Sequence, residues 1–223
     1  SASRSNMRNT ASNFLRGVGY GKRGDILDAH LIKDDFCFTH EGHLIPIADN
    51  HSIKCVLSFI NSIYSQYIIN QYCEQHKSNG YVNLLPMPDY STRISNLENI
   101  VNNIIQLKRY LFSLDETNLE YRGLIAQLDL SSNISNAFNI LQSDLTRDYN
   151  NYLSLVEQND NLWMDLAEIE EESDFRKTLN DYKARRPYEE LLSIDNASNK
   201  NIIDKKILAQ EIVQELVGMA FGR

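Results

Sequence analysis

The spacing of the apolar residues changes near residue 90, and this change limits the possible folds more than any other feature of the sequence. Before it, stretches such as "DAHLIKDDFCFTHEGHLIPIA" (residues 28–48) alternate apolar and polar residues, which is typical of half-buried strands. After it, apolar residues recur every three or four positions over long stretches, which is typical of amphipathic helices. We therefore expect an α+β fold, with a mixed α/β domain over residues 1–90 and a mainly helical domain over residues 91–223.

In the first half, turns are expected at Asp34-Asp35 and at Glu41-Gly42. A helix capped by Ser52 is expected to run to about His76. Asn79-Gly80 then indicates a tight turn, and the prolines that follow it indicate an extended segment. The candidate inward positions of the strands are Phe36, Phe38, Leu44, Ile45 and Ile47.

In the second half, the apolar stripes predict a long helix over residues 94–112 and a final helix over about 202–220. Between them, residues 119–128, 134–145 and 149–169 repeat the helical pattern. Residues 183–200 are expected to form a loop. The acidic run "EIEEES" (residues 168–173) is expected to be a solvated helix face rather than a metal or acid/base site.

Composition points to an ordinary globular chain, with 42% apolar and 23% charged residues among 223. No apolar run approaches the roughly 20 residues that span a bilayer, and the polar start lacks the apolar segment of a signal peptide. Cys37, Cys55 and Cys73 are too dispersed for a disulfide framework and fit free, mostly buried thiols. We expect a cytoplasmic protein without membrane contact, and a chain that is a fragment of a longer one.

The net charge of −8 is unevenly distributed along the chain. Up to Arg93 the chain carries 9 Lys and Arg against 8 Asp and Glu, so the remainder carries 13 against 22. The acidic total argues against a chain that simply coats nucleic acid, but it leaves room for a local positive face on the first half.

The stretch "GVGYGKRG" (residues 17–24) places glycines beside a basic pair. Gly19 and Gly21 would permit a positive φ or the close approach of a ligand, and Lys22 and Arg23 would suit a phosphate. The alternative is an ordinary glycine turn with solvated charges. Arg and Lys neutralise phosphates, Asn pairs with adenine edges, and Tyr stacks or bonds a phosphate. The candidate DNA-contact residues are Arg16, Tyr20, Lys22, Arg23, Lys77, Asn79, Tyr81 and Asn83.

Other chemistry has less support in the sequence. Cys37, His40, His43, Cys73 and His76 are residue types that ligate zinc, but on an alternating strand Cys37 and His40 point to opposite faces, so we assign no metal site. The chain has no nucleophile elbow, no Walker loop and no dinucleotide fingerprint, so we assign no catalytic residue.

The segment "LSFINSIYSQYIINQYCEQHKSNGYVNLLPMPD" (residues 57–89) resembles the C-terminal target-recognition regions of adenine-specific DNA methyltransferases, including type IIG restriction–modification enzymes. The chain is most similar to the PglX family, the adenine methyltransferases of BREX phage-defence systems. Six segments resemble that family in the same order: "GYGKRGDILDAHLI", "FTHEGHLIPI", "NQYCEQHKSNGYVNLLP", "QLKRYLFSLDETN", "NAF" and "VGMAFGR".

The resemblance implies a recognition fragment without catalytic machinery. In the family, a separate catalytic domain carries an S-adenosylmethionine loop and an Asn-Pro-Pro-aromatic motif. Neither occurs here, since no two of the four prolines are adjacent. This chain would therefore hold no cofactor, and S-adenosylmethionine would bind the missing catalytic domain. Residues 1–90 would grip double-stranded DNA while the adenine leaves the stack, and residues 91–223 would form a helical spacer, incomplete at its C-terminus.

Two alternatives to DNA recognition stay open at this point. The acidic helical half could instead dock another protein of a BREX or restriction system, with "EIEEES" carrying the interaction. A zinc-stabilised structural domain is a third, weaker possibility.

Overall fold

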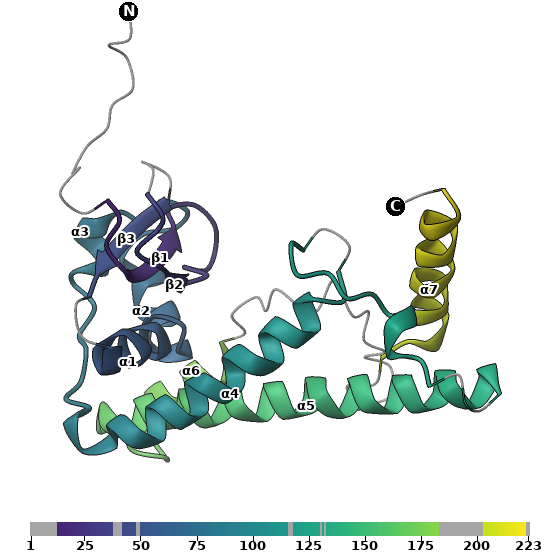
Figure 1. Ribbon diagram of the computed structural model, residues 1–223. Coiled ribbons are helices and arrows are strands. Elements are labelled where there is room, and N and C mark those ends of the chain that lie inside the picture. Colours follow the sequence, from purple (N-terminus) through teal and green to yellow (C-terminus); the bar gives the residue numbers. More distant parts are fainter. Residues whose placement is uncertain are drawn as a thin grey trace, which may run out of the picture. The chain divides into compact units, whose positions relative to one another are not determined.

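The computed structural model describes residues 13–37, 42–47, 50–115, 118–129, 131, 133–182 and 203–221. These residues form a small three-stranded antiparallel sheet and a larger set of helices, which confirms the predicted α+β class (Figure 1). The chain divides into two compact units. Unit 1 is Ser1–Val101 with Glu157–Arg185, and unit 2 is Asn102–Val156 with Arg186–Arg223.

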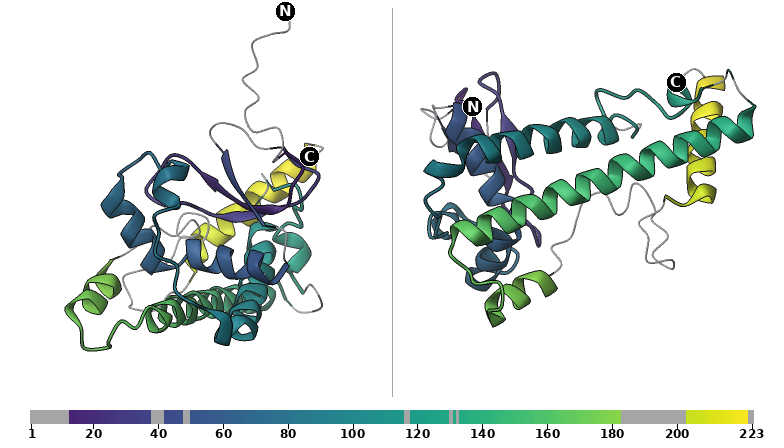
Figure 2. Two further views of the ribbon diagram at one scale, coloured as in Figure 1. Left: turned by 90° about the vertical axis from the view of Figure 1, so that its left-hand side faces the viewer. Right: turned by 90° about the horizontal axis from the view of Figure 1, so that it is seen from below.

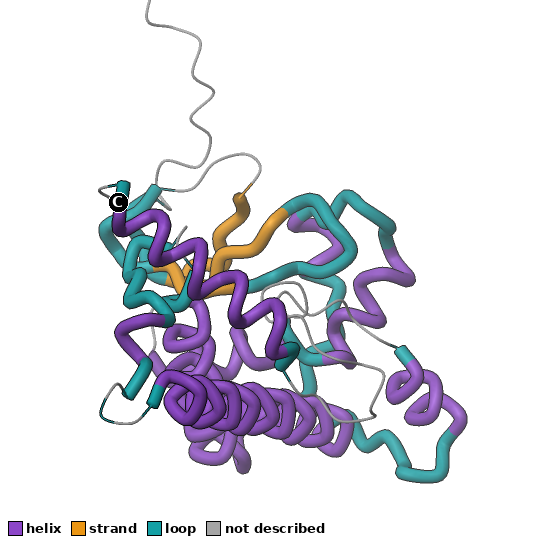
Figure 3. The backbone as a smooth tube through the Cα atoms, turned by 90° about the vertical axis from the view of Figure 1, so that its right-hand side faces the viewer, coloured by secondary structure: helices purple, strands orange, loops and turns teal. Residues whose placement is uncertain are grey.

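The division into units differs from the predicted boundary after residue 90. The chain leaves unit 1 within helix α4 (Ile94–Phe112) and returns to it within helix α5 (Ile134–Leu166). Each unit therefore contains part of both helices. All strands of the described residues belong to unit 1, as the colouring by secondary structure makes clear (Figure 3).

Strand β1 (Gly17–Gly21) is the central strand of the sheet, between β2 (His30–Ile32) and β3 (Gly42–Pro46). Its glycines alternate with the buried Val18 and Tyr20, so one face of β1 has no side chains. Neighbouring groups fill that space: a Cβ on Gly19 would lie 2.7 Å from Cγ1 of Ile32. The predicted turn at Gly19 is therefore wrong. The turn follows the strand, and the positive φ (115°) occurs at Gly24.

The inward positions expected in the first half are confirmed in part. Leu44 is buried, and Ile45 and Ile47 are half-buried. Phe36 is 54% exposed, which corrects the expectation that it faces the core. The chain turns at Asp34-Asp35 as predicted. Phe38 and Glu41 lie outside the described residues.

The single helix predicted from Ser52 is two helices, α1 (Asn50–Ile60) and α2 (Ile63–Tyr72). Ser62 ends the first and caps the second, because its Oγ accepts a hydrogen bond from the Ser65 N–H at 3.2 Å. Helix α1 contacts β1 and β2. Asn79-Gly80 begins the one-turn helix α3 (Asn79–Val82) instead of a tight turn.

The C-terminal part of α5 completes the core of unit 1 through polar contacts. The buried Trp163 donates its Nε1–H to Ser58 Oγ at 2.7 Å, and Asn159 bonds both the side chain and the carbonyl of Ser58. Asp160 accepts the Ile63 N–H at 2.8 Å, where α2 begins. Helix α6 (Asp174–Asp181), which the apolar pattern did not predict, packs on α2, with the Phe175 ring 5.8 Å from that of Tyr67.

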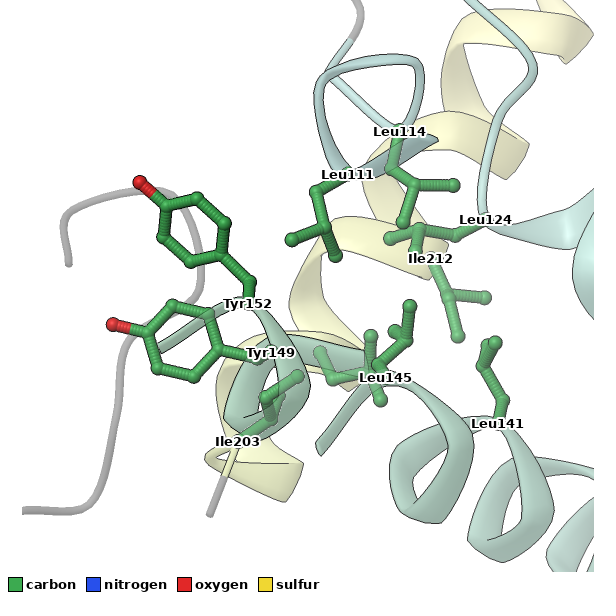
Figure 4. Close-up of a cluster of buried hydrophobic side chains, with 10 residues drawn as sticks. Leu111, Leu114, Leu124, Leu141, Leu145, Tyr149, Tyr152, Ile203 and Ile212 are labelled. Carbon is green, nitrogen blue, oxygen red and sulfur yellow. The ribbon is translucent and has the colours of Figure 1, made fainter. Parts of the chain in front are cut away.

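Unit 2 is built around an apolar core of three helices. Helix α7 (Lys205–Ala220) crosses the N-terminal part of α5 in the right-hand view of Figure 2. In Figure 4 the labelled leucine side chains and Ile212 gather in one place, and the rings of Tyr149 and Tyr152 lie next to each other at the edge of this group. The core consists of Leu111, Leu114, Leu124, Leu141, Leu145, Tyr149, Tyr152, Ile203, Leu208 and Ile212.

The helices predicted at residues 94–112 and about 202–220 are confirmed by α4 and α7. The stretch 119–128 is not a helix but an irregular segment with one 3₁₀ turn, η3 (Ile125–Gln127). Residues 134–145 and 149–169 were expected to be separate, and they belong to one helix, α5, that ends at Leu166. The run "EIEEES" therefore follows α5 rather than lying on a helix face. Residues 183–200 lie outside the described residues.

Candidate nucleic-acid interface

Two turns that the sequence separates by about fifty residues pair with each other in unit 1. Arg23 and His76 form an antiparallel bridge. Beside it, the Lys77 N–H donates to the Lys22 carbonyl at 2.7 Å, and the Gly24 N–H donates to the Gln75 carbonyl at 3.2 Å. We call residues 21–24 and 74–83 the paired-loop surface. Both segments that the sequence analysis selected for DNA contact meet here.

Lys77 holds these two turns together from the inside. Its side chain is fully buried, and its Nζ donates to the carbonyls of Gly24 at 2.6 Å and Glu74 at 2.7 Å. Burial lowers the pKa of the Lys77 ammonium, and the neighbouring Cys73 and Asp25 oppose that shift. This placement corrects the expectation of a phosphate contact at Lys77, because the ammonium is already bonded inside the unit.

Tyr20 is likewise a core residue, with 1% of its surface exposed. Its hydroxyl donates to Asn79 Oδ1 at 2.6 Å, and its ring lies 5.3 Å from that of His43. Burial raises the pKa of Tyr20 to about 12. The expectation that Tyr20 contacts DNA is corrected in the same way, because its ring is enclosed. The Tyr20 hydrogen bond instead connects β1 to the first residue of α3.

The remaining predicted residues lie at the surface of unit 1. Arg16, which precedes β1, and Arg23 are exposed, and Lys22 is half-buried. Tyr81 is 40% exposed on α3, and Asn83 is exposed at its C-terminal end. The same turns also carry the exposed carboxylates of Asp25 and Glu74, which reduce the positive charge of the paired-loop surface.

Amide side chains that the sequence analysis did not select fix the loop after the basic turn. Asn61 bonds both backbone groups of Ala29, donating to its carbonyl at 2.9 Å and accepting its N–H at 3.0 Å. Gln66 accepts the Leu27 N–H at 3.2 Å. Asn61 and Gln66 thus act as substitute strand partners. The sequence did contain an indication of this role, since both are polar residues in the middle of a predicted amphipathic helix.

The described residues contain no group of three His, Cys, Asp or Glu side chains placed to hold a metal ion. Of the zinc-ligand types considered above, Cys37 is exposed and Cys73 is half-buried, whereas His40 lies outside the description. Burial raises the pKa of the Cys73 thiol, and Lys77 partly opposes this. No helix within the described ranges is long and apolar enough to cross a membrane.

The exposed arginines, the half-buried lysine and the exposed tyrosine and asparagine are the groups that bind phosphates and bases. Lys22 and Arg23 lie on a turn whose main chain is held by hydrogen bonds to residues 75–77, and Tyr81 lies on α3, so their backbone positions are defined without a ligand. Comparisons with family models, with curated proteins and with solved structures find no match to this chain.

Proposed function

We propose that unit 1 binds double-stranded DNA through the paired-loop surface. On this proposal the chain is the target-recognition part of an adenine-specific DNA methyltransferase of a BREX or restriction–modification system, working in the cytoplasm. A separate catalytic domain would bind S-adenosylmethionine and transfer the methyl group. This chain would hold the duplex while the adenine leaves the stack.

The observation that carries the proposal is the pairing of the two turns at Arg23 and His76. Lys22 and Arg23 came from one segment and Asn79, Tyr81 and Asn83 from another, and a DNA surface needs them together. The Tyr20–Asn79 hydrogen bond adds a second link between these segments. The ordered resemblance to the PglX family supports the same function independently.

Different side chains of the surface would have different tasks. Lys22 and Arg23, together with Arg16 from just before β1, would contact phosphates, which sets affinity without reading sequence. Asn83 and Tyr81 would meet base edges or stack, which sets the preference for one sequence over another.

The alternative function, docking of a partner protein through the acidic residues of the chain, is favoured by one observation. A cleft with a partly apolar lining lies beside the "EIEEES" run in unit 1. It is distinct from the paired-loop surface, so the two functions do not compete for the same residues.

The experiment is fluorescence anisotropy of the full chain with a labelled random-sequence duplex, at low and at physiological salt. We expect binding that weakens steeply as salt rises, because bound phosphates release counterions. Lys22→Ala with Arg23→Ala should weaken binding to every duplex and reduce the salt dependence. Asn83→Ala should change the ranking of duplexes more than the mean affinity.

The matched control is Lys177→Ala with Lys206→Ala, which removes the same charge from two helices outside the paired-loop surface. The control should bind like the parent. Equal losses in the control and in the Lys22/Arg23 variant would contradict the assigned surface, and no binding at low salt would contradict DNA binding by this chain alone.

A further inference from the structure

A cleft of about 700 Å³ lies in unit 1 and is lined by residues other than those of the paired-loop surface. Its walls come from Tyr64 of α2, from residues 86–93, and from residues 162–168 at the C-terminal end of α5. Pro86, Met87, Pro88, Leu162 and Leu166 are apolar lining residues, but polar atoms make up more of the exposed lining than apolar atoms do. An open cleft of this size with a mixed lining can hold one side chain of a ligand against its apolar residues.

The walls of the cleft are held in place by bonded and packed neighbours. The Tyr64 hydroxyl donates to the Pro86 carbonyl at 3.3 Å. The Tyr90 ring packs against the buried Trp163 of α5, with ring centroids 5.9 Å apart. Segment 86–90 is thereby fixed to both helices that border the cleft, so the cleft exists before a ligand binds.

The charge of the lining is negative. Asp89, Asp165 and Glu168 contribute carboxylates, and Arg93 is the one basic side chain among the described lining residues. The Asp165 carboxylate accepts a hydrogen bond from the buried Arg176 at 2.8 Å, which compensates its charge, so the negative charge of the walls comes from Asp89 and Glu168. Asp89 accepts the Ser91 N–H at 2.9 Å, which lowers the pKa of its carboxyl group, so it is ionised at neutral pH. The end of α5 adds the negative pole of the helix dipole.

Glu168 has a backbone conformation that glycine adopts more easily. It follows the end of α5 with a φ of 55°, in the left-handed region that side chains other than glycine and asparagine rarely occupy at a helix end. A glutamate here costs stability compared with glycine, but it places a carboxylate at the cleft. The exposed Glu170, Glu171 and Glu172 continue the negative surface beyond it.

These carboxylates are spread around the cleft rather than gathered at one point. They do not form a group that could hold a metal ion in the described part of the chain. A negative surface also repels nucleic acid. The arrangement suits an extended chain with several positive groups and an apolar side chain between them.

We propose that this cleft binds an extended segment of a partner protein in which arginine or lysine residues flank a large apolar residue. The apolar side chain enters between the prolines and the leucines of α5. The flanking cations face Asp89 on one wall and Glu168 on the other, and the charges match. This proposal does not depend on DNA binding by the paired-loop surface.

The test uses the full chain and a fluorescein-labelled peptide, Arg-Leu-Arg-Leu-Arg, with anisotropy as the readout. We expect saturable binding that weakens about five- to tenfold with Asp89→Asn and Glu168→Gln together, since each exposed ion pair contributes only modestly to affinity. A peptide with glycine in place of leucine should bind more weakly to the parent protein.

Two further variants separate a binding effect from a folding effect. Glu168→Gly removes the carboxylate and the backbone strain together, so it should weaken peptide binding while leaving thermal stability equal or higher. Asp34→Asn with Asp35→Asn removes the same charge from an exposed turn outside the cleft, and peptide binding should be unchanged.

A photo-crosslinking version of the peptide should label residues 86–93 or 162–168, as identified by mass spectrometry. The proposal is overturned if the peptide does not bind the parent, if the cleft variants bind it as the parent does, or if the crosslinks fall elsewhere. It is also overturned if the Asp34/Asp35 variant loses as much affinity as the cleft variant, because the attraction would then be a property of the whole surface.

Discussion

The two units are stabilised in different ways. In unit 1, polar side chains (amides, hydroxyls and an ammonium) form hydrogen bonds with the main chain of irregular segments. In unit 2, mainly leucine and tyrosine side chains from three helices form one apolar core. Asn61, Gln66 and Lys77 in unit 1 each bond backbone groups far away in the sequence. The ten buried members of the unit 2 core are leucine, isoleucine and tyrosine residues.

The difference follows from the secondary structure of each unit. Short strands and turns leave backbone N–H and C=O groups that need partners, and buried side chains supply them. Helices satisfy their own backbone groups, so their packing depends on shape and apolar area. A unit made of turns therefore needs specific polar residues, and a unit made of helices needs apolar residues of suitable size.

Unit 2 also has contacts of the kind common in unit 1. Gln142 donates to the Ile203 carbonyl at 2.6 Å, and Thr146 accepts the Ile203 N–H at 3.4 Å. The Glu215 carboxylate of α7 accepts the N–H groups of Leu124 and Ile125 at 2.8 and 3.1 Å, where the 3₁₀ turn begins. Gly123 has a φ of 75°, and a Cβ there would lie 2.1 Å from Glu215 Oε1. The backbone groups bonded in these contacts belong to Leu124, Ile125 and Ile203, which lie outside the α-helices, so polar bonding in unit 2 also serves irregular segments.

The largest effect should come from the apolar core. Leu145→Ala empties a fully buried position of unit 2 and should lower the free energy of unfolding by about 2–5 kcal/mol. Urea denaturation followed by far-UV circular dichroism measures this. The matched control is Leu119→Ala at a fully exposed leucine, which should change stability by less than about 0.5 kcal/mol. Similar curves for both variants would contradict the described core.

The next largest effect should come from the buried lysine of unit 1. Lys77→Met keeps the length of the side chain but leaves the Gly24 and Glu74 carbonyls without their donor, which should cost about 1–3 kcal/mol. Fluorescence of Trp163, the single tryptophan and part of unit 1, reports the unfolding. Lys206→Met at an exposed position is the control. If Lys77→Met were as stable as its control, buried hydrogen bonds to the main chain would not be what stabilises unit 1 differently from unit 2.

A smaller effect should appear at alkaline pH. The folded pKa of Tyr20 is about 12 against an ordinary value of 10.0, so between these values the unfolded chain binds fewer protons and the free energy of unfolding falls as pH rises. At pH 11 the loss assigned to Tyr20 is about 1 kcal/mol. The difference between parent and Tyr20→Phe should therefore shrink from pH 8 to pH 11. A difference independent of pH would mean that the Tyr20 hydroxyl is not enclosed.

The smallest effect should come from the Glu215 contact of unit 2. Glu215→Gln keeps an acceptor oxygen but removes the charge that strengthens both hydrogen bonds, and should cost about 0.5–1 kcal/mol. Thermal unfolding by circular dichroism measures it, with Glu211→Gln on an exposed part of the same helix as control. A loss as large as that of Leu145→Ala would mean that polar contacts dominate unit 2 as well.

The same comparison explains which parts of the fold could be predicted. Helices α4 and α7 were predicted because an apolar stripe is a local pattern. The stretch 119–128 has a similar stripe but lies in an irregular segment capped by Glu215, and no local pattern reveals a cap ninety residues away. Asn61 and Ser62 interrupt the helix predicted from Ser52, because their side chains bond backbone outside it or start the next helix.

The candidate site was predicted in part for the same reason. Residue types selected two segments that meet at the Arg23–His76 bridge, but not which of their side chains face outward. The sequence does not indicate whether a lysine is buried or exposed. Lys77 differs from Lys22 only through the carbonyl groups that surround its ammonium in the structure.

By itself, the sequence determined the α+β class, the position of the main helices and the absence of known catalytic motifs, because composition, periodicity and motifs depend on neighbouring residues. Only the tertiary structure decided that Tyr20 and Lys77 lie inside unit 1, that residues 21–24 meet residues 74–77, and that Asp89 and Glu168 border one cleft. These facts depend on which distant segments pack together. The spacing of apolar residues within one segment does not indicate which other segment it contacts.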